Sequence, residues 1–202
     1  MALWAIVPVK PLRRGKSRLA KVISAEERAD LNQYLLKHTI QVLSTIDEIE
    51  NILVISRDTA ALALARDLGA RTVQENGNPE LNTALTRAVE IARTYETYGI
   101  LVVPADLPRL NAEDIRKILD HREDPPVVVI APDRKREGTN ALLVCPPNLI
   151  EFRYGPGSFD KHSQAAREAG ARLEVCDLPA LELDLDEPED LALIEEDLRV
   201  ND

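Results

Sequence analysis

Apolar residues follow two patterns along this chain: short continuous runs, and longer segments in which they recur with a helical period. The short runs predict buried strands, and the periodic segments predict helices that pack against a sheet. The expected strands cover residues 3–9, 51–56, 71–74, 100–103, 127–131, 141–144 and 172–176. The expected helices cover residues 24–44, 58–68, 81–95, 111–121, 159–169 and 188–198. Strands that alternate with helices in this way are typical of a doubly wound α/β fold.

Local signals refine this pattern. Ser24 is followed by Glu27 three residues later, which predicts a capping box at the start of a helix. Asn111 and Ser158 each precede a helical segment and are expected to act as N-caps. The connection between the expected strands at 127–131 and 141–144 has no room for a crossover helix, so this pair should be antiparallel and the sheet mixed.

Composition narrows the class of protein. The 202 residues contain no linker-like stretch, so we expect one domain covering 1–202. The formal net charge of −10 argues against a nucleic-acid partner. No apolar run approaches the ~20 residues of a membrane span, and no signal peptide is apparent. We therefore expect a soluble, cytoplasmic protein whose two cysteines, Cys145 and Cys176, are buried thiols.

Acidic residues end two apolar segments. The run at 101–103 leads to Asp106, and Pro108 then prevents a central strand from continuing. Asp106 should therefore lie at the carboxyl end of a core strand, where open α/β sheets bind ligands. The same change from apolar to acidic residues recurs at Asp184 and Asp186, which indicates a second acidic strand end. The alternative, that Asp106 caps the next helix, is weaker because Asn111 is itself a good cap.

A basic loop follows the first strand. Residues 10–18 hold five of the 25 basic residues and one glycine, a combination that suits a triphosphate. The alternative is a solvated basic turn. Gly15-Lys16-Ser17 resembles part of a P-loop, but Lys10 stands where that motif requires its first glycine, so a P-loop kinase is the weaker hypothesis.

Two further segments can hold anions or a nucleoside. The Gly-Pro-Gly-Ser turn at 155–158 enters a helix, so the Ser158 hydroxyl and the first helical N–H groups can receive an oxyanion. The Thr139 hydroxyl, at the start of a strand, can face the same site. Asn82 can either bind a base or ribose or cap a helix. The acidic strand ends suit Mg²⁺. Together with the basic loop and the anion-binding turn, they indicate metal-assisted transfer between two anionic substrates.

Six motifs in this order resemble one known family. They are Trp4 to Lys10, Gly15-Lys16-Ser17-Arg18-Leu19, Pro104-Ala105-Asp106-Leu107-Pro108, Gly138-Thr139-Asn140-Ala141, Tyr154-Gly155-Pro156-Gly157-Ser158 and Asp184-Leu185-Asp186. Together they are similar to the 2-phospho-L-lactate guanylyltransferase family, which includes the phosphoenolpyruvate guanylyltransferases of deazaflavin coenzyme (factor 420) biosynthesis. The resemblance implies a Rossmann-like nucleotidyltransferase fold, similar to nucleotide-diphospho-sugar transferases, with a three-layer sandwich and a mixed, mostly parallel sheet.

The resemblance also implies a reaction and a site. The phosphate of phosphoenolpyruvate or 2-phospho-L-lactate would attack the α-phosphorus of GTP, and pyrophosphate would leave. The implied nucleotide-binding residues are Lys10, Gly15, Lys16, Arg18 and Asn82, and the implied acceptor-binding residues are Thr139, Gly155 and Ser158. Asp106, Asp184 and Asp186 would hold Mg²⁺, and Lys16 and Asp106 would be catalytic. A homodimer is expected.

Two alternatives remain open from the sequence. One is a nucleotidyltransferase with another acceptor: 3-phosphoglycerate, a sugar phosphate or the molybdenum cofactor. The other is a non-catalytic regulator that binds a nucleotide, which would not need three acidic residues at this edge of the sheet.

Overall fold

The computed structural model describes residues 2–77 and 80–193. The strands are β1 (Ala2–Val9), β2 (Ile49–Ser56), β3 (Arg71–Gln74), β4 (Thr97–Val102), β5 (Val127–Pro132), β6 (Thr139–Cys145) and β7 (Arg172–Val175). The helices are α1 (Ala25–Ser44), α2 (Thr59–Asp67), α3 (Leu81–Arg93), α4 (Ala112–Asp120), α5 (Ser158–Glu168) and α6 (Pro179–Glu182), with a 3-10 helix η1 at Ser17–Lys21. A further helical segment covers 188–193, and the rest of the helix expected at 188–198 lies outside the described residues.

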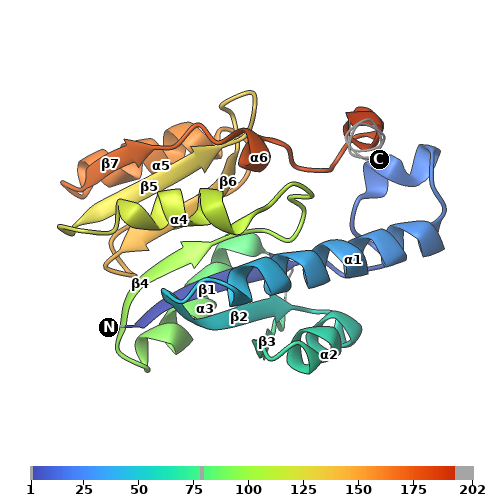
Figure 1. Cartoon of the computed structure of the whole chain (residues 1–202), viewed down its shortest axis with the longest axis horizontal. Coiled ribbons are helices and arrows are strands. Elements are labelled where there is room, and N and C mark those ends of the chain that lie inside the picture. Colours follow the sequence, from blue (N-terminus) through green and yellow to red (C-terminus); the bar gives the residue numbers. More distant parts are fainter. Residues whose placement is uncertain (1, 78–79, 194–202) are drawn as a thin grey trace.

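The strands described form one mixed sheet in the order β3-β2-β1-β4-β6-β5-β7 (Figure 1). β6 runs antiparallel to both of its neighbours, β4 and β5, and the other pairs are parallel. The predicted antiparallel pair is therefore confirmed. The strand order extends from β1 in both directions, since β2 lies on one side of β1 and β4 on the other. Open α/β sheets bind ligands at such a topological switch point.

The sheet is the middle of three layers. Along β1, Leu3, Ala5 and Val7 face one core, whereas Trp4 and Ile6 face the other, as the two-residue period of a strand requires. Helices α1, α2, α4 and α6 cover the first face, and α3 and α5 cover the second. The predicted three-layer α/β architecture is confirmed.

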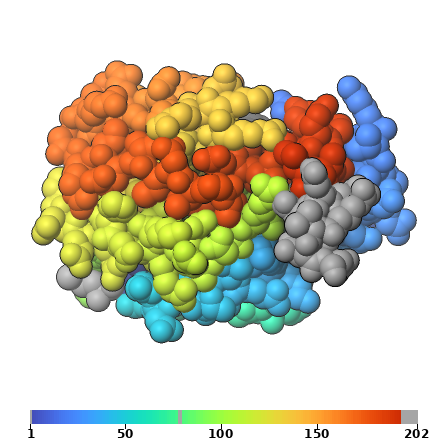
Figure 2. Space-filling view, turned by 45° about the horizontal axis from the view of Figure 1, so that its top comes forward, coloured from blue at the N-terminus to red at the C-terminus, as the bar shows by residue number. Residues whose placement is uncertain are grey.

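A small third cluster joins an early segment and a late segment of the described chain. Leu19 of η1 and Leu35 of α1 pack against Leu185, which follows α6. Figures 1 and 2 show the red segment after α6 reaching the blue segment that contains η1. This contact places the basic loop against the acidic segment. In the described part of the chain, no helix has the length and apolar character of a membrane span.

Candidate active site

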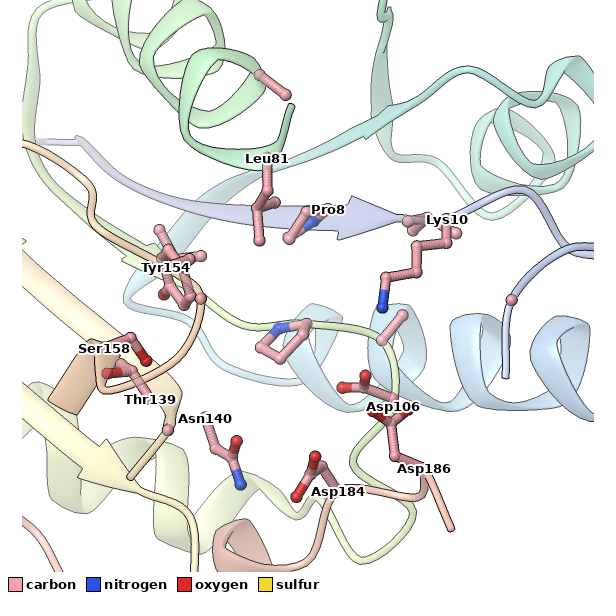
Figure 3. A pocket seen from close by; sticks show the side chains of 18 of the residues that line it. Pro8, Lys10, Leu81, Asp106, Thr139, Asn140, Tyr154, Ser158, Asp184 and Asp186 are labelled. Carbon is pink, nitrogen blue, oxygen red and sulfur yellow. The ribbon is translucent and has the colours of Figure 1, made fainter. Parts of the chain in front are cut away.

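A cleft of about 650 Å³ opens above the carboxyl ends of β1 and β4 (Figure 3). Nearly all of the site residues expected from the sequence line it: Lys10, Gly15, Lys16, Arg18, Asp106, Thr139, Gly155, Ser158, Asp184 and Asp186. In Figure 3 the three aspartates gather at one end, near the side chain of Lys10, while Thr139 and Ser158 lie together at the other end. The cleft therefore has a charged end and a hydroxyl-bearing end.

The basic loop after β1 is held from two sides. The backbone N–H of Leu12 donates to Asp58 Oδ2 at 2.8 Å, and Asn32 Nδ2 donates to the Leu12 carbonyl at 2.6 Å. Gly15 packs closely against Asn32, since a Cβ at this position would lie 2.9 Å from Asn32 Nδ2. Lys16 has a φ of 54°, in the left-handed region. This fold of the loop carries Lys10 and Lys16 into the cleft.

Lys16 connects the basic loop to the acidic segment. The residue is only 8% exposed, and its Nζ donates a hydrogen bond to the Leu185 carbonyl between Asp184 and Asp186. Burial lowers the pKa of Lys16, and the carboxylates of Asp106 and Asp186 oppose that shift. Lys16 is thus a buried cation that lies near three carboxylates and one like charge, Lys10.

The acidic residues come together through backbone pairing. The Leu185 N–H donates to the Asp106 carbonyl at 2.9 Å, so the segments after β4 and after α6 run next to each other. Burial raises the pKa of Asp106, and the charge of Lys16 opposes the shift. Burial, followed by repulsion from Asp106, raises the pKa of Asp184 to about 6. Asp106 and Asp184 therefore repel each other, and the charge of Lys16 offsets only part of the cost of burying the Asp106 carboxylate.

The prediction of a second acidic strand end is wrong. Asp184 and Asp186 follow the short helix α6 and lie in irregular backbone, not at the end of a strand. Pro179 occupies the first helical position, where its fixed φ favours a helix start. The alternative role of Asp106 as a helix cap is also excluded, because Asn111 Oδ1 accepts from the Asp114 N–H at 2.9 Å.

The oxygen atoms of these carboxylates are suitable ligands for a hard cation, but the carboxylates do not form a complete coordination site by themselves. Within residues 2–77 and 80–193, no three acidic, histidine or cysteine side chains form a group that could hold a metal ion. Asp106 Oδ1 is nevertheless buried and has no hydrogen-bond partner among the described residues. Mg²⁺ is commonly held by one or two carboxylates together with substrate phosphates and water. The residues present fit such a shared site, and the metal assignment stays a prediction.

The hydroxyl-bearing end is built from β6 and the turn before α5. Gly155 and Gly157 have φ values of 120° and 69°, which side chains rarely tolerate, so the turn depends on its glycines. Thr139 is 6% exposed and Ser158 is 2% exposed, and both line the cleft. Thr139 Oγ1 lies 3.0 Å from His162 Nδ1.

Two details of the expected anion receptor are wrong. Gly157, not Ser158, is the N-cap of α5, and Ser158 is the first helical residue, so its hydroxyl is not a cap. The N–H groups of Ser158 and Phe159 are already used, because they donate to the carbonyls of Gly155 and Glu137. The Gly residue at the cap has no side chain to signal its role, and the loop that carries Glu137 is distant in sequence. Any anion here therefore depends on the hydroxyls more than on the helix N–H groups.

Asn82 lies outside the cleft lining and makes a different contact. Glu80 caps α3 by accepting from the N–H groups of Asn82 and Thr83, so the capping role considered for Asn82 is wrong. Both ends of its amide instead hold the Tyr154 backbone, at 2.7 Å to the N–H and 3.2 Å to the carbonyl. Asn82 thereby fixes the turn that leads to Ser158, and its nucleotide-binding role stays a prediction.

Arg18 differs from the two lysines. Its side chain is 65% exposed and makes ion pairs with Glu187 at 3.0 Å and with Asp186 at 3.9 Å. It therefore offsets part of the negative charge of Asp186 and Glu187.

Sequence reasoning missed Asn140, Tyr154 and His162 as parts of the site. Asn140 lines the cleft and donates from Nδ2 to the Leu181 carbonyl at 2.8 Å, which fixes α6. His162 follows Ser158 by four residues and so shares its helix face. That spacing was the one local signal available for it.

Comparison with known proteins identifies the family. The model of CofC-like guanylyl transferases matches residues 3–195. The chain belongs to this family. A phosphoenolpyruvate guanylyltransferase from Rubrobacter xylanophilus is 42% identical over 195 residues, which cover 96% of this chain and 94% of that protein. A 2-phospho-L-lactate guanylyltransferase from Methanothermobacter thermautotrophicus is 35% identical, covering 96% of this chain and 84% of that protein.

A solved structure supports the fold. The structure of a nucleotidyl transferase from Methanothermobacter thermautotrophicus superposes with a TM-score of 0.71 at 15% identity, covering 100% of this chain and 99% of that one. The predicted nucleotidyltransferase fold is confirmed. Membership of the guanylyl transferase family likewise confirms the predicted class of enzyme.

Proposed function

We propose that this guanylyl transferase family member transfers GMP from GTP to the phosphate of phosphoenolpyruvate or 2-phospho-L-lactate and releases pyrophosphate, in biosynthesis of the deazaflavin coenzyme factor 420. The observation that carries the proposal is that one cleft joins a cationic loop with the buried Lys16, an acidic cluster and a hydroxyl-bearing end. The names of the relatives from Rubrobacter and Methanothermobacter, a phosphoenolpyruvate guanylyltransferase and a 2-phospho-L-lactate guanylyltransferase, support this assignment of donor and acceptors.

The cationic loop would receive the triphosphate. Lys10 and Lys16 supply positive charge at the end of β1, and Gly15 lets the backbone turn closely there. Lys16 is held by the Leu185 carbonyl, so its charge is already positioned and little reorganisation is needed when charge develops on the leaving pyrophosphate. Lys16 would therefore act as a catalytic residue.

The carboxylates of Asp106, Asp184 and Asp186 would hold Mg²⁺ together with phosphate oxygens. The ion would neutralise phosphate charge and align the reacting groups, as metals do in phosphoryl transfer. The buried, unpartnered Oδ1 of Asp106 and the raised pKa of Asp184 both mark carboxylates that a cation would stabilise.

Thr139, Gly155 and Ser158 would bind the acceptor. The hydroxyls of Thr139 and Ser158 lie at the end of the cleft opposite the carboxylates, so an acceptor held there would direct its phosphate toward the three aspartates. The attacking group is an oxygen of the acceptor phosphate itself, so the transfer requires no covalent intermediate on the protein.

The test is pyrophosphate release with GTP, Mg²⁺ and one acceptor at a time. Phosphoenolpyruvate, 2-phospho-L-lactate and 3-phosphoglycerate are compared by kcat/KM, with Asp106→Asn as the inactive control. We expect release only when GTP and one of the first two acceptors are both present. Turnover confined to 3-phosphoglycerate or a sugar phosphate would favour the alternative acceptors, and GTP binding without any turnover would favour a regulator.

Three properties of the protein accompany this proposal. We expect a homodimer in a cytoplasmic setting, with no nucleic-acid partner because the net charge is −10. Sedimentation of the purified protein tests the oligomeric state, and a monomer at micromolar concentration would contradict that part.

A further inference from the structure

His162 is buried in α5 and uses both ring nitrogens. Nε2 lies 3.0 Å from the Arg153 backbone nitrogen, and Nδ1 lies 3.0 Å from Thr139 Oγ1. The residue is 0% exposed, and the ring of Tyr154 packs edge-on against it at 4.8 Å between centroids. The imidazole therefore lies between the turn that precedes Ser158 and the strand that carries Thr139.

These contacts determine where the ring proton lies. The backbone N–H of Arg153 can only donate, so Nε2 must present its lone pair. A neutral ring then carries its hydrogen on Nδ1 and donates it to Thr139 Oγ1. Burial, with the positive charges of Arg153 and Lys161, lowers the pKa of His162 to about 4, which agrees with a neutral ring at pH 7.

The direction of this bond determines what Thr139 can do. A hydroxyl has one hydrogen to donate and lone pairs to accept. Because Thr139 Oγ1 accepts from His162, its own hydrogen remains for another acceptor, and Thr139 lines the cleft. The oxygens of a phosphate or carboxylate are such acceptors, and hydrogen bonds to charged groups are the stronger kind.

We propose that His162 is a positioning residue that fixes the Thr139 hydroxyl as a hydrogen-bond donor to an anionic oxygen of the acceptor. This inference rests on the proposed function, because it assigns Thr139 to the acceptor end of the cleft. It assigns His162 no proton transfer during the reaction. The competing explanation is that His162 only holds α5 against β6.

Two substitutions separate the two bonds of the ring. In His162→Asn the short side-chain amide can replace Nδ1–H as the donor to Thr139. In His162→Gln the longer side chain can place its oxygen near Nε2 and accept from the Arg153 N–H, but it leaves Thr139 without its donor. Ser163→Ala is the matched control, since Ser163 is the next residue of α5, is 3% exposed, and its Oγ is buried without a partner in the described part of the chain.

Steady-state kinetics with GTP and phosphoenolpyruvate varied separately, alongside melting curves, give the readout. We expect His162→Gln to raise the acceptor KM about 10-fold, the scale of a lost hydrogen bond to a charged group, while the GTP KM stays within about 2-fold. His162→Asn should recover most of that loss. Equal impairment in both variants, or an equal rise in both KM values, would overturn the proposal in favour of a structural role.

A double-mutant cycle tests whether His162 acts through Thr139. In a Thr139→Val background, His162→Gln should change the acceptor KM by less than about 2-fold, because the group it orients is absent. Two effects that multiply independently would overturn the proposal. The Ser163→Ala control should match the wild type.

Nitrogen-15 NMR of the histidine rings tests the geometry without turnover. At pH 7, His162 should show a protonated Nδ1 and an unprotonated Nε2, with its signals assigned by their loss in His162→Gln. A protonated Nε2 would overturn the positioning role. Absence of pyrophosphate release by the wild type would refute the proposed function, and the NMR result would still decide the state of His162.

Discussion

Replacing Asp184 with asparagine should stabilise the ligand-free protein while it removes turnover. Burial and repulsion from Asp106 raise the pKa of Asp184 from 3.8 to about 6. At pH 7 the folded protein therefore holds a carboxylate in an unfavourable place. An amide of the same shape removes that charge, so the substitution replaces an electrostatically unfavourable functional group with a neutral one.

The magnitude follows from the shift in pKa. About two units correspond to roughly 3 kcal/mol at 1.36 kcal/mol per unit. Asp184 is half-buried, and solvent screening reduces this upper bound to on the order of 1 kcal/mol. For a chain of this size, that gain should raise Tm by about 2–4 °C.

The dependence on pH has a definite sign. A carboxyl group whose pKa is raised in the folded state favours folding when it is protonated. Its contribution is fully present below about pH 4 and is lost as the pH rises through about 6. The Tm advantage of Asp184→Asn should therefore be absent near pH 4 and reach its full size by pH 7.

Melting curves at pH 4, 5, 6 and 7, without nucleotide or divalent cation, give the test. Asp177→Asn is a matched control, because this carboxylate is 56% exposed, lies outside the cleft lining and pairs with Arg136. The control should retain turnover and should not raise Tm. A Tm of Asp184→Asn at pH 7 that is equal to or below that of the wild type would refute the reasoning, as would an advantage that does not vary with pH.

Three further predictions follow from the same geometry. Lys16→Ala should raise the GTP KM about 10-fold or more and leave the acceptor KM nearly unchanged, and GTP parameters within about 2-fold of wild type would contradict a role for this buried cation. Ser158→Ala should raise the acceptor KM about 10-fold with little change in Tm, because its hydroxyl is not the helix cap; a Tm loss with unchanged KM would contradict this. The contribution of His162 to the stability of the wild type should fall by roughly 3 kcal/mol as the pH falls from 6.5 to about 4, because the folded state depresses the pKa of His162, and protonation of Asp184 should offset part of this loss. The change in unfolding free energy per pH unit, measured by denaturant unfolding across that range, should be smaller in His162→Gln. Equal changes in the two proteins would exclude His162 as the source of the pH dependence.

The parts of the fold that sequence predicted well depend on local signals. The capping box of Ser24 and Glu27 is present as expected, with hydrogen bonds of 2.7 Å and 3.2 Å. The continuous apolar run of β4 became a central strand, and its acidic continuation at Asp106 faces the cleft. These features depend on residues within a few positions of one another, so pattern and propensity are sufficient.

The parts that sequence could not supply depend on contacts between distant segments. Asn82 holds the backbone of Tyr154, 72 positions later, and the sequence around either residue contains no signal of that contact. His162 meets Thr139 across 23 positions for the same reason. Asp184 approaches Asp106 because the Leu185 N–H donates to the Asp106 carbonyl. The hydrophobic pattern alone indicates a second strand end at this place, and the structure has this contact between irregular segments instead.

The fate of each phosphate of GTP tests the central claim most directly. The protein is incubated with Mg²⁺ and phosphoenolpyruvate, and with GTP labelled at either the α- or the γ-phosphate, and the products are separated. The proposed reaction places the α label in a guanosine diphosphate bridged to the three-carbon acid and the γ label in pyrophosphate, in equal amounts. A γ label found on the acceptor, or an α label that remains in free GDP or GMP, would contradict guanylyl transfer.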